Sequence, residues 1–385
     1  FIPDRTINAE GYIVCPGLID LSARLREPGY EYKATLESEL YAAVAGGVTS
    51  IACPPDTDPV LDEPGLVEML KHRARTLNQA HVYPVGALTV GLKGEALTEM
   101  AELSDAGCIA FSHADAPFIN TRVIYRAMQY AATYNFTVWL RPQDAYLGEG
   151  GVAHDGEIAT RLGLPAIPSL AETIALTTLI SLARETGVKL HICRLSTASG
   201  IQIIQQAREE GLAITCDVSS QHVHLSEQDI GNFDSHFHLA PPLRSQTDRN
   251  AIRAGLASGE IDAICSDHTP VDEDAKLLPF SQSEPGATGL ELLLPLTLKW
   301  AREEEIKLVD ALRLITQTPA KILGIKAGSL DVGEPADICI FDPEQSWRVT
   351  PETLISQSKN TPFLDMDMKG RVMYTLMEGA VVYET

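Results

Sequence analysis

Short apolar runs rich in β-branched residues alternate with longer amphipathic stretches along most of this chain, and this alternation restricts the fold more than any other feature. Eight runs have the length and composition of strands: 11–25, 48–55, 81–89, 107–113, 136–142, 188–195, 212–219 and 261–268. The intervening segments carry apolar residues every three to four positions, as in helices. Because strands that alternate with helices build parallel sheets, and eight such strands close a barrel, the sequence predicts an α/β fold. We expect a (β/α)8 TIM-like barrel over residues 12–325.

The pattern changes near Lys326, where two runs of alternating apolar and polar residues follow each other with no helix between them. A small β domain is expected over residues 326–385. A β-sandwich needs more strands than this tail supplies, so we expect residues 1–11 to contribute to a sandwich formed from both chain ends. The chain begins at Phe1 without an initiator Met, so the N-terminal part of this domain is expected to be incomplete.

The formal net charge of -22 restricts the kinds of partner. Such a chain is repelled by phosphate backbones and by anionic lipid, so we expect neither a nucleic acid nor a membrane partner. No apolar stretch approaches the roughly 20 residues of a membrane span, and no signal peptide is evident. The seven cysteines are widely spaced and form no CxxC pair, which is typical of reduced thiols in a cytoplasmic protein.

In such a barrel the residues that follow the strands decide the chemistry, because active sites lie at the C-terminal ends of the strands. The first predicted strand continues as DLSARLREPG, and the eighth continues as SDHTP. PGLIDLSARLREPG resembles the segment of type I dihydroorotases in which an HxH pair binds catalytic zinc, although both histidines are replaced here. Further segments resemble that family in the family's order: GVTSIACPPDTDPV, IAFSHADAP, VWLRPQDAYLGEGG, LHICRLSTA, LAPPLRS, CSDHTP, GLELLLPL, TPAKILGI and KNTPFLDMDMKGRV. The resemblance therefore covers nearly the whole chain and implies an amidohydrolase-type barrel.

Carried over residue by residue, the family's metal positions are degenerate. The two histidines of the family's first strand correspond to Ser22 and Arg24. The acid of its fourth strand corresponds to His113 or Ala114, and the histidines of its fifth and sixth strands correspond to Arg141 and Arg194. The aspartate of its eighth strand is kept as Asp267. A guanidinium group stays protonated and only donates hydrogen bonds, so it cannot be a metal ligand. We therefore predict that zinc is absent and that no catalytic residue remains, because Asp267 has no metal-activated water to deprotonate.

The substrate positions implied by the resemblance are only partly kept. Arg26 matches the family's carboxylate-binding arginine and His268 matches a family position, whereas Asp56 and Ala240 replace substrate-contacting residues. An aspartate at a site for a dianionic substrate adds repulsion, so we expect no substrate binding. We further expect the three arginines to pair with Asp267 and nearby carboxylates, since unpaired buried acids are costly.

Three other interpretations stay open. The pairs His222/His224 and His236/His238 suggest a relocated metal site, although we favour framework histidines there and at His191 and His268. The chain could also be an active amidohydrolase, a dihydroorotase or related cyclic amidase, with an altered or mononuclear site that uses Asp267 with His113 or the strand 7 histidines. Alternatively, an arginine-lined barrel mouth could bind an anionic metabolite, because guanidinium groups match carboxylate and phosphate.

The resemblance is strongest to the noncatalytic dihydroorotase homologues of some bacteria, which are needed for the assembly of aspartate transcarbamoylase in pyrimidine biosynthesis. It implies an inactive structural subunit whose partner is the aspartate transcarbamoylase catalytic chain. It also implies a homodimer within a larger hetero-oligomer.

Overall fold

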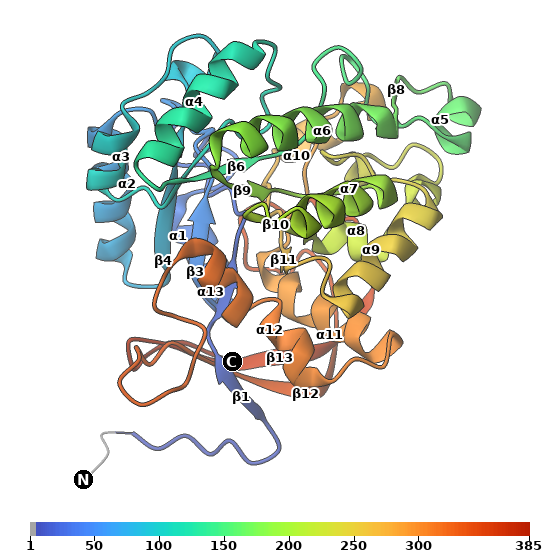
Figure 1. Ribbon diagram of the computed structural model, residues 1–385. Coiled ribbons are helices and arrows are strands. Elements are labelled where there is room, and N and C mark those ends of the chain that lie inside the picture. Colours follow the sequence, from blue (N-terminus) through green and yellow to red (C-terminus); the bar gives the residue numbers. More distant parts are fainter. Residues whose placement is uncertain (1–4) are drawn as a thin grey trace.

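Eight parallel strands form a barrel in the computed structural model, which describes residues 5–385 (Figure 1). Their order is β11-β10-β9-β6-β5-β4-β3-β2, and a parallel bridge between Ala23 and His268 brings the two edge strands together. The bounds are β2 (Leu18–Asp20), β3 (Val48–Cys53), β4 (His81–Ala87), β5 (Ala110–Ser112), β6 (Thr137–Leu140), β9 (Lys189–Ile192), β10 (Ile214–Ser219) and β11 (Ala263–Cys265). The predicted barrel is therefore confirmed.

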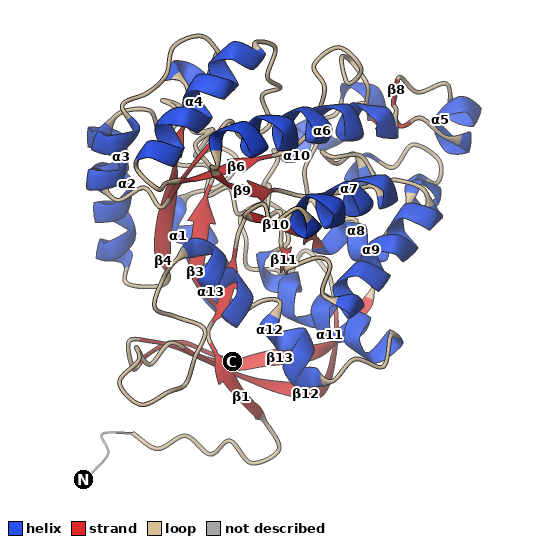
Figure 2. Ribbon diagram, in the orientation of Figure 1, coloured by secondary structure: helices blue, strands red, loops and turns tan. Residues whose placement is uncertain are grey.

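Helices surround this barrel, as the secondary-structure colouring of Figure 2 shows. The main ones are α1 (Leu36–Ala45), α2 (Pro64–Leu77), α3 (Met100–Ala106), α4 (Thr121–Thr133), α6 (Ser169–Thr186), α7 (Ala198–Glu209), α9 (Gln246–Ser258) and α11 (Leu293–Glu303). Shorter elements are α5 (Glu157–Leu162), α8 (Ser220–His224), α10 (Glu273–Lys276), α12 (Leu308–Arg313), α13 (Gln317–Leu323) and the strand pair β7 (Ala153–His154) and β8 (Ala166–Ile167). The local sequence sets several boundaries: Thr35 and Ser38 form a capping box at α1, and left-handed Gly187 ends α6.

The two chain ends meet in one four-stranded antiparallel sheet, which we call the end sheet. It consists of β1 (Ile13–Pro16), β12 (Ile338–Arg348), β13 (Asp367–Met377) and β14 (Ala380–Glu384), in that order. The stretch 11–25, expected as one strand, is thus divided between the end sheet and the barrel. The break lies at Gly17, where a Cβ atom would come within 2.1 Å of Thr49 Oγ1. Strand β1 lies in the range 12–325 assigned to the barrel, and residues 1–4 of the predicted segment 1–11 lie outside the described residues.

Small and medium apolar side chains fill the barrel itself. Ile19, Ala52, Val85 and Ala263 belong to this inner cluster, and residues of α13 pack into it. The N–H of Ile19 at the start of β2 also donates to the carbonyl of Ile315, shortly before α13. The N-terminal end of the barrel is therefore covered, and the opposite strand ends are left to build a site.

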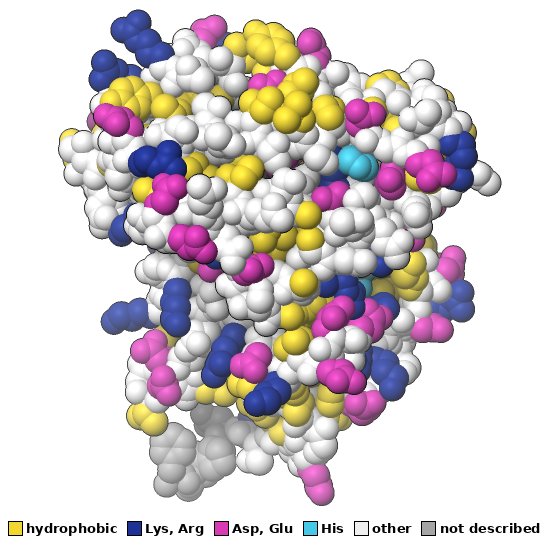
Figure 3. Space-filling view, turned by 45° about the vertical axis from the view of Figure 1, so that its right-hand side comes forward, with side chains coloured by type: hydrophobic (Ala, Val, Ile, Leu, Met, Phe, Trp, Pro, Cys, Tyr) yellow, Lys and Arg dark blue, Asp and Glu magenta, His cyan; other side chains and the backbone are white. Residues whose placement is uncertain are grey.

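Most cysteines lie in the interior, and the surface carries charges of both signs. Within the described residues no helix has both the length and the hydropathy needed to cross a membrane. All seven cysteines are free thiols, and six of them are buried. On the face in Figure 3, acidic and basic side chains are interspersed rather than gathered by sign.

Candidate functional site

The charged residues predicted at the strand ends converge at one end of the barrel. Arg24 follows β2, Arg141 follows β6, Arg194 follows β9 and Asp267 follows β11. Because the strands are parallel, all four lie at their C-terminal ends. The side chains of the three arginines are only 6%, 6% and 4% exposed, respectively.

Asp115, which follows β5, holds the three guanidinium groups together. Its Oδ2 accepts from Arg24 Nη2 at 2.6 Å, and its Oδ1 accepts from Arg141 Nε at 2.6 Å. Arg194 donates to both carboxylate oxygens, with Nη1 at 3.4 Å from Oδ2 and Nη2 close to Oδ1. One carboxylate thus receives hydrogen bonds from three cations, each of them a charge-assisted contact.

Two further carboxylates complete this group, which we call the Arg–Asp cluster. Asp56 Oδ2 accepts from Arg24 Nε at 2.8 Å. Asp267 Oδ1 accepts from Arg194 Nη1 at 3.0 Å and lies 3.5 Å from Arg24 Nη1. The cluster therefore contains three arginines and three aspartates, Asp56, Asp115 and Asp267. Their formal charges cancel.

The cations determine the protonation state of the central acid. Burial by itself would raise the pKa of Asp115, but Arg194, Arg24 and Arg141 hold it well below its usual value of 3.8. Burial also opposes the charge of Arg194, yet Asp115 and Asp267 raise its pKa well above its usual value. Asp115 is therefore ionised and Arg194 protonated at neutral pH, so each remains available to the other as an ion-pair partner.

Several residues of the barrel mouth adopt left-handed backbone conformations that only glycine adopts easily. Arg26, Ala114, Arg194 and Asp267 have φ values of 62°, 50°, 53° and 46°. Such a conformation costs about 1–2 kcal/mol per residue. Arg194 and Asp267 belong to the cluster, and Ala114 directly precedes Asp115. The ion pairs hold these turns in place.

Little empty space remains inside the cluster. The cavity at the barrel centre, lined by Ser22, Arg24, Arg141 and Arg194 among others, has a volume of about 20 Å³. A space of that size holds about one water molecule, whereas ligand pockets typically measure roughly 300–1,000 Å³. Guanidinium groups occupy the region in which a ligand would otherwise bind.

Ser22 and His113, which follow the first and fourth barrel strands β2 and β5, make structural contacts. The carbonyl of Ser22 accepts from the N–H of His268 at 3.1 Å, which helps to join the first and last strands. His113 lies with its Nδ1 3.4 Å from Thr89 Oγ1, and its ring stacks on Phe118 with centroids 3.9 Å apart. Burial lowers the pKa of His113 to about 4, so the ring is neutral at physiological pH.

The positions matched to substrate binding are also engaged. Arg26 Nε donates to the carbonyl of Pro270 at 2.8 Å, and the carbonyl of Ala240 accepts from Arg194 Nη1 at 3.1 Å. His268 is completely buried, with Nε2 2.6 Å from Glu39 Oε2. Its Nδ1 accepts from the N–H of Gly289 at 3.1 Å. His268 therefore links β11 to α1 and to the loop before α11.

One other group of side chains has the proximity of a metal site. Within the described residues, His191, Cys193 and Asp217 form the one set of three or more potential ligands whose atoms lie within 4.8 Å of one another. His191 Nε2 is already 2.9 Å from Asp217 Oδ2, and its Nδ1 is 2.8 Å from Thr215 Oγ1. Burial raises the pKa of the Cys193 thiol well above 9.0, so it is not the thiolate that metals prefer. We interpret this group as a hydrogen-bonded part of the framework.

The two histidine pairs that follow β10 are held by similar contacts. His222 lies with Nδ1 2.7 Å from Ser219 Oγ and Nε2 3.1 Å from the carbonyl of Pro242. His224 Nε2 is 2.9 Å from the carbonyl of Leu296. His236 and His238 contact Asp234 and Ser283, each at 2.9 Å. The His222/His224 and His236/His238 pairs therefore serve separate local structures.

The residue that sequence reasoning missed is Asp115. The family's strand 4 acid was carried over to His113 or Ala114, yet the acid at this strand end lies one or two positions later. The segment SHADAP does contain it, and three unpaired arginines at other strand ends are a signal that an acid should lie among them. Its position follows from the left-handed turn at Ala114, which the sequence does not reveal.

Replacing Asp115 should destabilise the protein. Asp115→Asn leaves three buried guanidinium groups without their shared partner, and we expect a loss of about 2–4 kcal/mol in the free energy of unfolding. This is less than for a fully buried pair because the Asp115 side chain is 33% exposed. The matched control is Asp310→Asn, which breaks an exposed pair with Arg313 and should cost less than about 0.5 kcal/mol. Urea denaturation measures both, and equal effects would contradict the central role of Asp115.

The contribution of Asp115 should depend on pH in one direction. Its pKa is lower in the folded protein than its usual value of 3.8, so the ionised form stabilises the fold above about pH 4. The difference in unfolding free energy between the parent and Asp115→Asn should stay constant from about pH 7 to 5. It should then shrink as the pH falls below about 4. A difference that vanishes already near pH 6 would show that Asp115 has no lowered pKa.

Comparisons with known proteins place this chain in a family. A family model described as "Dihydro-orotase-like" matches residues 11–199. A "Dihydroorotase-like protein" of Pseudomonas aeruginosa is 43% identical over 384 residues, covering 100% of this chain and 90% of that protein. A protein of the same description from Pseudomonas putida is 45% identical over 383 residues, with the same shares covered. A "Dihydroorotase" of Syntrophotalea carbinolica is 40% identical over 377 residues, covering 98% of this chain and 89% of that protein.

Solved structures show the same architecture. The L-hydantoinase (dihydropyrimidinase) from Arthrobacter aurescens superimposes with a TM-score of 0.89 at 23% identity, covering 100% of this chain and 88% of that one. A D-hydantoinase from Bacillus sp. AR9 gives 0.82 at 23% identity, covering 98% and 87%. These likenesses show the fold, an amidohydrolase-type barrel with an added sheet. From the sequence relatives, the chain belongs to the dihydroorotase-like family.

Proposed function

We propose that this chain is a catalytically inactive member of its family that acts as a structural subunit in the assembly of aspartate transcarbamoylase. The Arg–Asp cluster is the observation that carries the first part of the proposal. Catalysis in this family is expected to depend on zinc, which would lower the pKa of a bound water and polarise the amide carbonyl. The residues present here do not fit that metal, because three of its ligand positions hold arginines that can only donate.

The retained acid is equally unsuited to catalysis. Asp267 would take a proton from a metal-bound nucleophile, but its carboxylate is occupied by Arg194 and lies beside Arg24. The cavity at the barrel centre, which Arg24, Arg141 and Arg194 line, has a volume of about 20 Å³, too small for a six-membered ring. The same lack of space disfavours the alternative in which the arginine-lined mouth binds an anionic metabolite, since the arginines already bind aspartates.

The family resemblance supports the proposed partner, and the intact fold is compatible with a structural role. The chain keeps a barrel with a filled core and a mouth in which each arginine of the Arg–Asp cluster contacts an acid, as expected for a chain whose shape is still needed. We propose that the aspartate transcarbamoylase catalytic chain is the partner, that the complex forms in the cytoplasm during pyrimidine biosynthesis, and that this chain enters it as a homodimer. The charge of -22 favours a protein partner over nucleic acid.

The purified chain should not interconvert dihydroorotate and carbamoyl aspartate, even with added zinc. The assay follows absorbance and product formation in both directions, with Asp267→Asn as the matched control. We expect the two proteins to be indistinguishable at background level. Turnover that requires zinc and is lost in Asp267→Asn would instead establish the alternative, an active amidohydrolase with an altered or mononuclear site.

Co-expression with the aspartate transcarbamoylase catalytic chain of the same organism should yield one complex. We expect both chains to co-elute in size-exclusion chromatography, with a mass from light scattering that corresponds to several copies of each. The catalytic chain expressed alone is the control, and it should give a smaller or less stable assembly. If the two chains elute separately at micromolar concentrations, the assembly role is wrong.

A further inference from the structure

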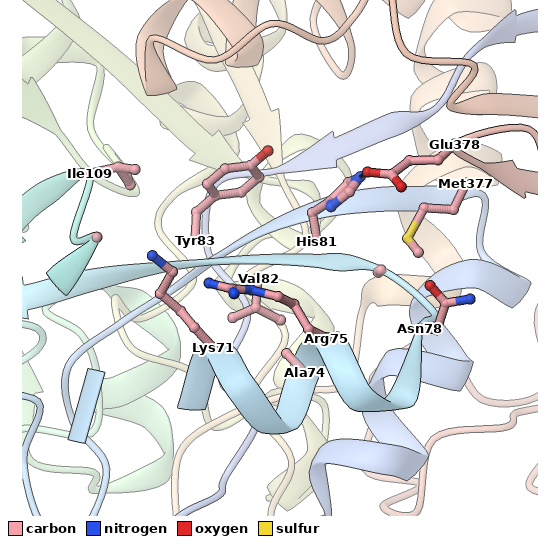
Figure 4. Close-up of a pocket in the computed structure, with 12 residues that line it drawn as sticks. Lys71, Ala74, Arg75, Asn78, His81, Val82, Tyr83, Ile109, Met377 and Glu378 are labelled. Atoms are coloured by element: carbon pink, nitrogen blue, oxygen red, sulfur yellow. Dashed lines mark ion pairs between the residues drawn. The ribbon is translucent and has the colours of Figure 1, made fainter. Parts of the chain in front are cut away.

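A second cavity lies at the opposite end of the barrel from the Arg–Asp cluster. It has a volume of about 520 Å³ and is lined by α2, by the beginning of β4 at His81, by Gly107 and Ile109, and by the turn at Met377 and Glu378 of the end sheet (Figure 4). This volume is within the range of roughly 300–1,000 Å³ of ligand pockets. The cavity lies where the barrel meets the end sheet, so it is separate from the family's active-site position.

One wall of this cavity is an open strand edge. Residues 81–84 of β4 pair with residues 50–53 of β3, but β4 pairs with β5 only from Val85 onward. On the β5 side the last contact is from the N–H of Ile109 to the carbonyl of Pro84, at 3.1 Å. Within the described residues, no strand continues this pairing toward His81. Backbone polar groups of that stretch are therefore available to a ligand.

Two cations from α2 supply the charge of the cavity. Lys71 and Arg75 are one helical turn apart, and Figure 4 shows their side chains extending along the cavity beneath β4. Among the described residues neither forms an ion pair, whereas Arg73 on the same helix pairs with Glu27. Two like charges at this spacing are slightly unfavourable on their own, and an anion between them would remove that repulsion.

A hydrogen bond and a neighbouring glycine define the position of the Lys71 ammonium group. Its Nζ donates to the carbonyl of Ala106 at 3.0 Å, which leaves two of its three donors free. Gly107, with φ of +113°, makes room for it, since a Cβ atom there would lie 1.8 Å from Nζ. A side chain at Gly107 would therefore displace the ammonium group from its present position.

The end of the cavity near His81 carries acidic side chains instead of cations. His81 Nε2 lies 3.3 Å from Asp337 Oδ2 and 3.9 Å from Glu378 Oε1. The hydrogen bond with Asp337 raises the pKa of His81, so the ring is satisfied by that acid. Glu378, which is 68% exposed, remains an acceptor at this end. Tyr83 also lines the cavity, on the same side of β4 as His81 in Figure 4, and its ring has an apolar face on which a ligand ring can pack.

We propose that this cavity binds a small ring-bearing organic anion, with its phosphate or carboxylate group held by Lys71 and Arg75 and the donors of its ring facing Glu378. A bound ligand would span the barrel and the end sheet and would hold the two together. This inference does not rest on the proposed function, because the cavity shares no residue with the Arg–Asp cluster.

Isothermal titration calorimetry on the full-length chain at low salt tests it with four probes. Cytidine 5′-monophosphate carries a ring and a phosphate, and orotate carries a ring and a carboxylate. Cytidine and inorganic phosphate supply the ring and the anion separately. We expect at least one of the two ring-bearing anions to bind at least tenfold more tightly than cytidine and phosphate, and the tighter one identifies the preferred anionic group.

The double variant Lys71→Met plus Arg75→Met should weaken that binding at least tenfold. The matched control is Arg122→Met plus Arg126→Met on α4, which removes the same charge at the same spacing from an exposed helix face away from the cavity. Its affinity should stay within twofold of the parent, and circular dichroism checks that both variants are folded. No binding of either ring-bearing anion, equal binding of inorganic phosphate, or an equal loss in the control would each overturn the proposal.

Discussion

Three guanidinium groups share one carboxylate at the mouth of this barrel, and the geometry of the surrounding loops follows from that contact. Taking an ion out of water costs several kcal/mol, so arginines with side chains no more than 6% exposed must each have a close partner. Asp115 alone cannot balance three positive charges, and Asp56 and Asp267 supply the remainder. The result is a neutral cluster in which every arginine contacts at least one acid. Removing any member leaves a charge in a place that water reaches poorly.

The same cluster explains why the mouth tolerates strain. Loops at the strand ends of a barrel carry function, and unusual backbone conformations gather at such sites. Here Arg26, Ala114, Arg194 and Asp267 have left-handed conformations, and the central cavity that Ala114 and Arg194 line measures only about 20 Å³. The ion pair between Arg194 and Asp267, and the hydrogen bond from Arg26 to the carbonyl of Pro270, hold these turns. These contacts are part of the structure that holds the barrel mouth together.

Much of this organisation follows from the sequence, and the exceptions have physical causes. The period of the apolar residues predicts the barrel, and the alternating tail predicts a sheet at the chain ends. The arginines at the strand ends predict a cluster of ion pairs. The division of the first strand at Gly17 depends on a close approach to Thr49, which joins residues far apart in the sequence. The placement of Asp115 among the arginines depends on the left-handed turn at Ala114. The cavity beside Lys71 depends on the point at which β4 and β5 stop pairing. Local patterns do not encode contacts of this kind.

The central claim is that guanidinium groups, and not divalent cations, organise the barrel mouth. A crystal structure of the chain grown with excess zinc, with anomalous diffraction recorded at the zinc absorption edge, tests it directly. We predict Arg24, Arg141 and Arg194 bound to Asp115, with no anomalous peak among them. Zinc ions bound at Asp267 with the arginines displaced toward solvent would contradict this account.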